Sequence, residues 1–452
     1  MWKPLIAGFA LAAAGRAQTG MEGSWQGTLD AGAMKLRIGL HVSKDAGGWT
    51  STFDSIDQGA RGIPVKVTTV SGQTLHFEMP AMAVKFDGTL SADGTEIAGT
   101  FTQGVEIPMV FKRVEKVETL NRPQTPKAPF PYQAIEVSYE DKQGKLAGTL
   151  TVPEGAGPFP AAIMITGSGP QNRDEELFGH KPFLVIADYL SRHGIAVLRI
   201  DDRGVGGSSG RSSQQTIQEM AADVLSDVDF LKGRPEINSK KIGVIGHSEG
   251  GIVGPLAASQ SSDIAFVVML AGTGVTGEQV MYRQAELIAK AGGGTDASIA
   301  QNRAIQEVIF AAARTAPDEQ TGLDRFRADW RKAHGSDPSA VLESQAKSVL
   351  APEIHSFAFY DPAENLRKLK VPVLALNGSR DLQVPPSQNL PAIRAALTAG
   401  GNKDFEVIEL PGLNHLFQTC QTCSPSEYGQ IEETFSPKAL EIMGEWLARH
   451  TR

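Results

Sequence analysis

The most informative stretch of the sequence is Lys241-Ile242-Gly243-Val244-Ile245-Gly246-His247-Ser248-Glu249-Gly250-Gly251-Ile252-Val253. An apolar run leads into Gly246, and a second run through Ala258 follows Gly251 at once. This order predicts a buried strand, a tight turn that presents Ser248, and a helix whose N-terminus faces the same point. A serine on such a turn is typical of a nucleophile, so Ser248 is the first candidate catalytic residue.

A second stretch, Gly206-Gly207-Ser208-Ser209-Gly210, also fits the Gly-x-Ser-x-Gly pattern. In 452 residues with 48 glycines a chance match is unsurprising, so the pattern alone is a weak signal. Ser208 has neither an apolar strand before it nor a helix directly after it. It follows Asp201-Asp202-Arg203-Gly204, which favours a shaped loop in which Arg203 anchors neighbouring carboxylates. The context therefore favours Ser248.

A serine hydroxyl needs a base, and the base needs an acid that orients it. His415 follows the last apolar strand, at the carboxyl end of the sheet where ligands bind in open α/β folds. Asp381 follows the strand before it, and the order Ser248, Asp381, His415 is the one expected of an α/β-hydrolase. His247 is expected to point away from the site if Ser248 faces it. The alternatives are a structural histidine and a loop aspartate paired with Arg380.

Stabilisation of a developing oxyanion requires two hydrogen-bond donors. The backbone N–H of Glu249, at the start of the predicted helix, is the first candidate. The second is the backbone N–H of Ser168 in Thr166-Gly167-Ser168-Gly169-Pro170, after an apolar strand. A nucleotide-binding loop is disfavoured there, because Asn172 stands where a third glycine belongs and Pro170 interrupts the helix start.

Apolar runs alternate with helical stretches from residue 134 to the end. The candidate strands are Ala134–Tyr139, Leu146–Val152, Ala161–Thr166, Ile195–Ile200, Ile242–Ile245, Phe266–Leu270, Val373–Leu376 and Phe405–Leu410. Continuously apolar strands are typical of a sheet covered on both faces. We therefore predict a doubly wound, mostly parallel sheet with an antiparallel hairpin at its start. Residues 275–361 show only helical pattern and predict an inserted cap, whose Ile288, Ile305, Ile309 and Phe310 either roof the acyl pocket or form the cap's own core.

The first third of the chain has a different organisation. Residues 1–17 carry an apolar run followed by small residues, which predicts a secretory signal and a secreted or periplasmic protein. Residues 18–115 contain short alternating strands separated by turns, which predicts a small antiparallel β-barrel or sandwich. The prolines within residues 116–133 predict a stiff linker ahead of an α/β domain spanning 134–452.

Composition and cysteine usage restrict the partners. The formal net charge is −8 and no basic cluster occurs, so nucleic acid is not expected as a partner. No run reaches the eighteen apolar residues that a membrane span needs. Cys420 and Cys423 are the two cysteines, and a disulfide, free thiols and a redox or metal function all stay open. A zinc site would need two more ligands, and no second ligand pair exists, so no metal site is predicted. The oligomeric state is left open.

Four motifs in order resemble one known family. The loop Gly167-Ser168-Gly169-Pro170 with Arg173-Asp174, the elbow Gly246-His247-Ser248-Glu249-Gly250-Gly251, Gly378-Ser379-Arg380-Asp381, and Leu413-Asn414-His415 look like those of EstD-type bacterial serine esterases of the α/β-hydrolase superfamily. The resemblance covers about residues 135–452, and the N-terminal segment is similar to a lipocalin-like β domain. Thr166 departs from the family, which usually has histidine there. The resemblance implies hydrolysis of small carboxylic esters, preferably with short acyl chains, without a cofactor.

The sequence thus predicts a serine carboxylesterase whose catalytic residues are Ser248, Asp381 and His415. Two alternatives remain. A serine peptidase or an acyltransferase would use the same fold and the same three residues, because these do not fix the leaving group. A binding protein would use the β domain and retain the hydrolase part without activity.

Overall fold

The computed structural model describes residues 20–30, 35–211 and 215–451. The chain divides into two units, residues 1–120 and 121–452, and each has its own hydrophobic core. The division falls inside the proline-rich stretch that the sequence analysis assigns to a linker. The predicted signal segment, residues 1–17, lies outside the described residues.

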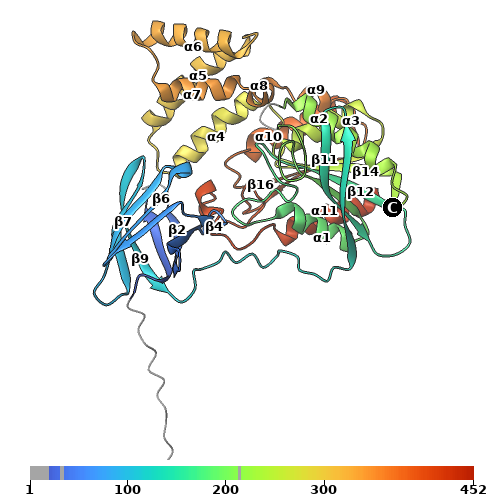
Figure 1. Ribbon diagram of the computed structural model, residues 1–452. Coiled ribbons are helices and arrows are strands. Elements are labelled where there is room, and N and C mark those ends of the chain that lie inside the picture. Colours follow the sequence, from blue (N-terminus) through green and yellow to red (C-terminus); the bar gives the residue numbers. More distant parts are fainter. Residues whose placement is uncertain (1–19, 31–34, 212–214, 452) are drawn as a thin grey trace, which may run out of the picture. The chain divides into compact units, whose positions relative to one another are not determined.

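The first unit is a curled antiparallel sheet of nine strands (blue to cyan in Figure 1). Its spatial order is β4-β3-β2-β1-β9-β8-β7-β6-β5. The strands are β1 (Gly23–Asp30), β2 (Lys35–Asp45), β3 (Gly48–Ser55), β4 (Ala60–Pro64), β5 (Val67–Ser71), β6 (Thr74–Met79), β7 (Val84–Leu90), β8 (Glu96–Gln103) and β9 (Val105–Val114). A short 3-10 helix, η1 (Pro80–Met82), joins β6 to β7. Over the described residues the ladder stays open between β4 and β5, so the predicted antiparallel barrel is a half-barrel.

Alternating apolar residues explain how this sheet curls around a core. In β7 every second residue is buried, as the two-residue period of a strand requires. Phe77 and Phe86 lie directly opposite each other on β6 and β7, and their ring centroids are 5.3 Å apart. Trp25 and Phe111 belong to the same buried cluster. The first unit therefore has the independent core that an all-β module needs.

The second unit is built on a mixed eight-stranded sheet, in the order β10-β11-β13-β12-β14-β15-β16-β17. The strands are β10 (Tyr132–Asp141), β11 (Gly144–Pro153), β12 (Phe159–Ile165), β13 (Ala196–Ile200), β14 (Ile237–His247), β15 (Ile264–Leu270), β16 (Val373–Gly378) and β17 (Phe405–Leu410). β10 and β11 form an antiparallel hairpin, and β11 is also antiparallel to β13. The remaining neighbours in the sheet, from β13 through β12 to β17, pair in parallel. The predicted α/β sheet with a hairpin at its start is confirmed.

Helices cover both faces of this sheet. They are α1 (Pro182–Arg192), α2 (Ile217–Lys232), α3 (Gly250–Gln260), α10 (Pro386–Ala399) and α11 (Pro437–His450). Apolar residues of α2, α3 and α10 join one core, and those of α1 and α11 join the other. Because the inner strands are buried from both sides, their sequences are almost continuously apolar. No helix in the described ranges is both long and apolar enough to cross a membrane.

A helical insert separates β15 from β16 (yellow to orange in Figure 1). It comprises α4 (Gly277–Ala291), α5 (Asp296–Arg314), α6 (Glu319–His334), α7 (Ala340–Leu350) and α8 (Pro352–Phe359), followed by the short α9 (Ala363–Leu366). Ile309, Phe310 and Phe326 lie in the insert's own buried core. The sequence analysis did not predict α8, because Pro352 directly after α7 marks a stop, whereas here it opens the next helix at N1.

Candidate active site

Ser248 occupies the sharp turn between β14 and α3. Its φ is +53°, a left-handed conformation that is rare for a residue with a side chain. The Ser248 N–H donates to the carbonyl oxygen of Leu270 at 2.8 Å, which fixes the turn on the neighbouring strand. A Cβ on Gly246 would overlap the backbone of Gly250, and one on Gly250 would overlap the carbonyl of Ile165. Only glycines permit this turn, which is why they flank the serine.

Asp381 and His415 come together on the loops that follow β16 and β17. His415 Nδ1 lies 2.8 Å from Asp381 Oδ2, and both side chains are buried. Asp381 Oδ1 accepts the backbone N–H groups of Gln383 at 2.8 Å and Val384 at 2.9 Å. The carboxylate is therefore held by three donors, and the alternative of a surface aspartate paired with Arg380 is wrong.

Among the described residues at this end of the sheet, the backbone N–H groups of Ser168 and Glu249 have no protein acceptor. In the same loop, the Gly167 N–H donates to Glu175 and the Gly169 N–H donates to Glu353. Both donors that the sequence predicts for an oxyanion are thus without a protein acceptor.

A pocket of about 660 Å³ opens at this point. Ser248, His415 and Ser168 all line it, which places the candidate nucleophile, base and oxyanion loop on one cavity. Of its lining residues only Leu177, Pro182 and Leu416 have apolar side chains; the others are polar residues and one glycine. Polar residues therefore predominate among those that line the cavity.

The insert does not contribute the predicted apolar roof. Ile309 and Phe310 are buried in the insert's own core, Ile305 packs against that core, and Ile288 does not line the pocket. A place in the cap's own core is thus observed for Ile305, Ile309 and Phe310.

Two carboxyl groups, the buried Glu249 and the half-buried Asp202, have raised pKa values in this region. Burial raises the pKa of Glu249 to about 8, and Glu353 and Asp202 act in the same direction. Burial also raises the pKa of Asp202 to about 7, although Thr166 Oγ1 donates to it at 2.7 Å. Near neutral pH Glu249 is therefore mostly protonated. This matters because a negative side chain beside the nucleophile would oppose an oxyanion.

Sequence reasoning missed His247 and Glu175. His247 does not point away from the site, as expected from its position beside Ser248, but lines the pocket. Its Nδ1 lies 2.9 Å from Glu175 Oε1, and its Nε2 lies 3.0 Å from the carbonyl oxygen of His415. No motif links positions 175 and 247, so the pair becomes visible only once the loops are folded.

The second Gly-x-Ser-x-Gly match has a structural role. The Ser208 hydroxyl donates to the carbonyl oxygen of Asp201 at 2.7 Å and accepts the Ala147 N–H at 2.9 Å. Arg203 pairs with Asp141 and Asp223, so its predicted role as an anchor for carboxylates is confirmed.

Cys420 and Cys423 form a disulfide in the segment after His415. The same turn is held by Glu427 of the 3-10 helix η3 (Pro425–Glu427), whose carboxylate accepts the backbone N–H groups of residues 421, 422 and 423. Across the described ranges no group of three or more His, Cys, Asp or Glu residues is arranged to hold a metal ion.

Comparisons with known proteins relate the chain to several hydrolases. A family model described as serine aminopeptidase, S33 matches residues 182–419. Esterase EstD of Thermotoga maritima is 27% identical over 374 residues, which cover 80% of this chain and 79% of the relative. Acyl-coenzyme A thioesterase 1 of Rattus norvegicus is 27% identical over 146 residues, 31% of each chain. A solved Pyrococcus furiosus esterase aligns with a TM-score of 0.45 and 16% identity, over 75% of this chain and all of that one.

The family model covers more than half of the chain, from the helix α1 to the loop that carries His415. The similarity to EstD extends over most of both proteins. The chain therefore belongs to the serine aminopeptidase S33 family and is an EstD-like α/β-hydrolase esterase.

Proposed function

We propose that the protein is a serine carboxylesterase that hydrolyses small esters through an acyl-enzyme on Ser248. The observation that carries the proposal is the strained Ser248 turn on the same pocket as the buried Asp381–His415 pair. A backbone held in an unfavourable conformation at a pocket is typical of functional sites. The three side chains come from three separate loops, and a purely structural role gives no reason for their convergence.

In the first half-reaction, Ser248 Oγ attacks the ester carbonyl carbon and His415 Nε2 takes the hydroxyl proton. The negative charge on the carbonyl oxygen is stabilised by the N–H groups of Ser168 and Glu249. Asp381 keeps the His415 proton on Nδ1 and stabilises the imidazolium. His415 then gives its Nε2 proton to the alcohol oxygen, the C–O bond breaks, and the acyl group remains on Ser248.

In the second half-reaction, water replaces the alcohol. His415 accepts a proton from the water as its oxygen bonds to the acyl carbon. The tetrahedral intermediate collapses, Ser248 Oγ leaves with the proton returned by His415, and the carboxylic acid departs. No cofactor is needed in either half.

The proposed substrates have short acyl chains. Each buried CH₂ adds up to about 0.8 kcal/mol of binding only where it meets apolar surface. The pocket offers three apolar side chains, too few to bury a long alkyl chain. With p-nitrophenyl esters, kcat/KM should peak between acetyl and hexanoyl and fall by dodecanoyl. A steady rise to palmitoyl, or activation at an emulsion surface, would refute the short-chain proposal.

A serine peptidase is the second candidate, because the matching family model is described as a serine aminopeptidase. Matched ester and amide substrates that share one acyl group separate the two activities. We expect kcat/KM for the ester to exceed that for the amide. Comparable values would favour the peptidase, and transfer of the acyl group to an added alcohol in preference to water would favour an acyltransferase.

The experiment that tests the proposal is the replacement of Ser248 by alanine. The variant should fold normally and lose a factor on the order of 10⁶ in kcat. A fluorophosphonate probe should label the wild-type protein once, at Ser248, and leave the variant unlabelled. A wild-type protein that takes up no probe would instead support the binding-protein alternative.

We further propose that the protein is exported. The apolar segment within residues 1–17 is typical of a secretory signal, and the Cys420–Cys423 disulfide suits an oxidising compartment. Fractionation of expressing cells, with the N-terminus sequenced, tests this. Intact protein that retains residues 1–17 in the cytosol would refute it.

A further inference from the structure

The site contains a second carboxylate–imidazole pair beside Asp381 and His415. Glu175 Oε1 lies 2.9 Å from His247 Nδ1, and both residues are buried. The His247 and His415 ring centroids are 4.8 Å apart. His247 immediately precedes Ser248, so this pair lies beside both the turn of the candidate nucleophile and the ring of the candidate base.

The hydrogen-bond partners of His247 determine how many protons it carries. Its Nε2 faces the carbonyl oxygen of His415 at 3.0 Å, and a carbonyl oxygen can only accept, so Nε2 carries a proton. Its Nδ1 faces Glu175 Oε1, which also accepts the Gly167 N–H at 2.7 Å. An unprotonated Nδ1 would direct its lone pair at this carboxylate oxygen, so the contact with a charged Glu175 requires a proton on Nδ1 as well. His247 is thus a buried imidazolium.

The electrostatic surroundings are consistent with that charge. Burial is the largest single influence on His247 and lowers its pKa, but Glu175, the His415 carbonyl and Asp381 together outweigh burial, so the pKa is raised. Asp202 is the other carboxyl group close enough to interact with Glu175. His415 faces His247 from the loop after β17. The net charge of the Glu175–His247 pair is zero.

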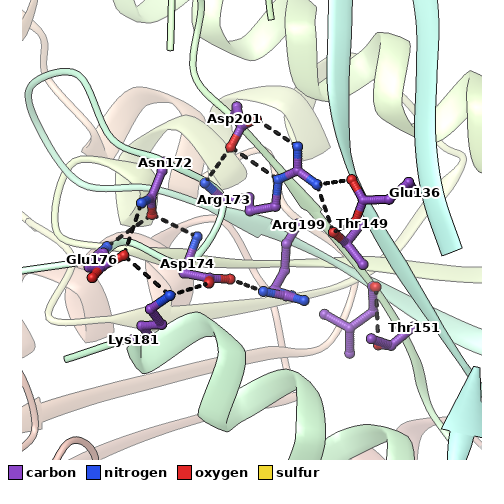
Figure 2. Close-up of polar contacts among 11 residues, drawn as sticks. Glu136, Thr149, Thr151, Asn172, Arg173, Asp174, Glu176, Lys181, Arg199 and Asp201 are labelled. Carbon is purple, nitrogen blue, oxygen red and sulfur yellow. Dashed lines mark hydrogen bonds and ion pairs between the residues drawn. The ribbon is translucent and has the colours of Figure 1, made fainter. Parts of the chain in front are cut away.

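The loop that carries Glu175 is firmly anchored. Figure 2 shows Arg173 turned toward Asp201, to which it donates from Nη2 at 2.7 Å, and Asp174 turned toward Arg199, with which it forms an ion pair. Glu175 follows directly, with a φ of +50° that is unusual for a residue with a side chain. Neighbouring ion pairs thus hold Glu175 in the conformation that aims its carboxylate at His247.

We propose that Glu175 and His247 are positioning residues whose charged pair ties the loops bearing Ser168 and His415 to the Ser248 turn. Glu175 fixes the N–H of Gly167, next to Ser168, and His247 fixes the carbonyl oxygen of His415. Neither residue exchanges a proton with substrate. The inference rests on the proposed esterase mechanism and explains how its base and its oxyanion donor keep one relative position.

Glu175→Gln tests the proposal. The glutamine oxygen can still accept the Gly167 N–H, but the negative charge that keeps His247 doubly protonated is gone. The pKa of His247 is then lower than in the wild type. At a pH above this pKa, the ring carries one proton, but both the side-chain oxygen at position 175 and the His415 carbonyl oxygen face it as acceptors. One of the two hydrogen bonds is lost, and the loop that it holds is released. At pH 8 we expect kcat to fall about 10- to 100-fold, because small misplacements of reacting groups cost that much, with KM changed less than threefold.

The pH profile separates positioning from a merely structural role. Wild-type kcat/KM should rise with pH as His415 loses its proton. Glu175→Gln should recover toward wild-type kcat at low pH, where His247 is charged again, so its profile becomes bell-shaped. A uniform loss at all pH values, or no loss, would overturn the proposal.

Asp404→Asn provides a matched control. His450 makes a similar pair of hydrogen bonds to a carboxylate and a carbonyl oxygen. Its Nε2 lies 3.2 Å from Asp404 Oδ1, and its Nδ1 lies 2.8 Å from the carbonyl oxygen of Trp446. Neither residue lines the active-site pocket, so this variant should keep the wild-type kcat and pH profile.

A measurement without turnover covers the case in which Glu175→Gln fails to fold. In ¹⁵N-histidine NMR of the wild-type protein at pH 8, one ring should have both nitrogens protonated, and its signal should disappear in His247→Gln. A neutral His247 would overturn the inference. The proposed function is tested separately: if Ser248→Ala kept its activity, the mechanism itself would fail, whatever Glu175→Gln does.

Discussion

Asp381→Asn is the substitution that most directly tests the role of the Asp381–His415 pair. Asp381 Oδ1 accepts two backbone N–H groups, from Gln383 and Val384. An asparagine must therefore keep its oxygen at that position, because its NH₂ group would face two donors. The NH₂ group is then directed at His415 Nδ1, which can only accept. The His415 proton moves to Nε2, the atom that should take the proton from Ser248.

The structure thus predicts a variant that folds normally but lacks its base. An acid-to-amide change of this kind in a catalytic triad costs about 10⁴ in kcat. At 1.36 kcal/mol per tenfold change, this corresponds to about 5.4 kcal/mol of transition-state stabilisation. Both backbone hydrogen bonds persist, so the melting temperature should change little.

The assay is hydrolysis of p-nitrophenyl acetate at pH 8, with thermal melts of both proteins. Enzyme concentration must be high enough to detect 10⁻⁴ of the wild-type rate, and Ser248→Ala gives the background. A kcat within tenfold of the wild-type value, at an unchanged melting temperature, would refute the assignment of Asp381. A large loss of stability would instead show that Asp381 acts mainly as a structural residue of its loop.

Three further changes have outcomes that the contacts predict. Ser208→Ala should leave kcat within twofold but lower the free energy of unfolding by about 1–3 kcal/mol, because the buried Ala147 N–H loses its acceptor; a large fall in kcat at full folding would contradict this. Burial raises the pKa of Asp227 to about 8 from 3.8, so the folded protein binds the extra proton between these values and is destabilised as pH rises through them. Asp227→Asn keeps an acceptor for the Tyr139 hydroxyl and should flatten the fall in melting temperature from pH 5 to 8; identical slopes would contradict the assignment. Reduction of Cys420–Cys423 should lower the melting temperature by no more than a few degrees, because the ring is short and Glu427 still binds the same turn; unfolding on reduction would show otherwise.

The parts of the protein that sequence alone predicts are those that depend on local chemistry. The strand, turn and helix around Ser248 follow from an apolar run, two glycines and small residues within a dozen positions. Asp381 and His415 follow from the same logic, because each comes directly after a buried parallel strand, and such strands end at one edge of a sheet. The helical character of the insert likewise follows from its apolar periodicity, although α8 does not.

Contacts between distant loops are not predictable in this way. A buried residue such as Phe310 satisfies the same apolar pattern whether it faces a substrate or its own helix neighbours, and only the packing decides between them. Whether β4 and β5 pair and close the curled sheet into a barrel is also not predictable, because the alternation of apolar and polar residues is the same in an open and a closed sheet. The direction of the His247 side chain is a further example. Neighbouring residues of a strand point to opposite faces, which predicts that His247 points away from Ser248, but the turn at Ser248 breaks that alternation.

The loop that carries Ser168, the candidate oxyanion donor, includes Arg173 and Asp174 as well as Gly167 and Gly169, and the contacts of these residues explain why. The glycines permit close approach, since a Cβ on Gly167 would lie 3.3 Å from Ser248 Cβ. A loop this small has no hydrophobic core to hold it, so its position must come from polar contacts. Arg173 and Asp174 supply them through Asp201 and Arg199 (Figure 2). The anchoring ion pairs lie outside the pocket, where they fix the Ser168 N–H without placing a charge beside the oxyanion.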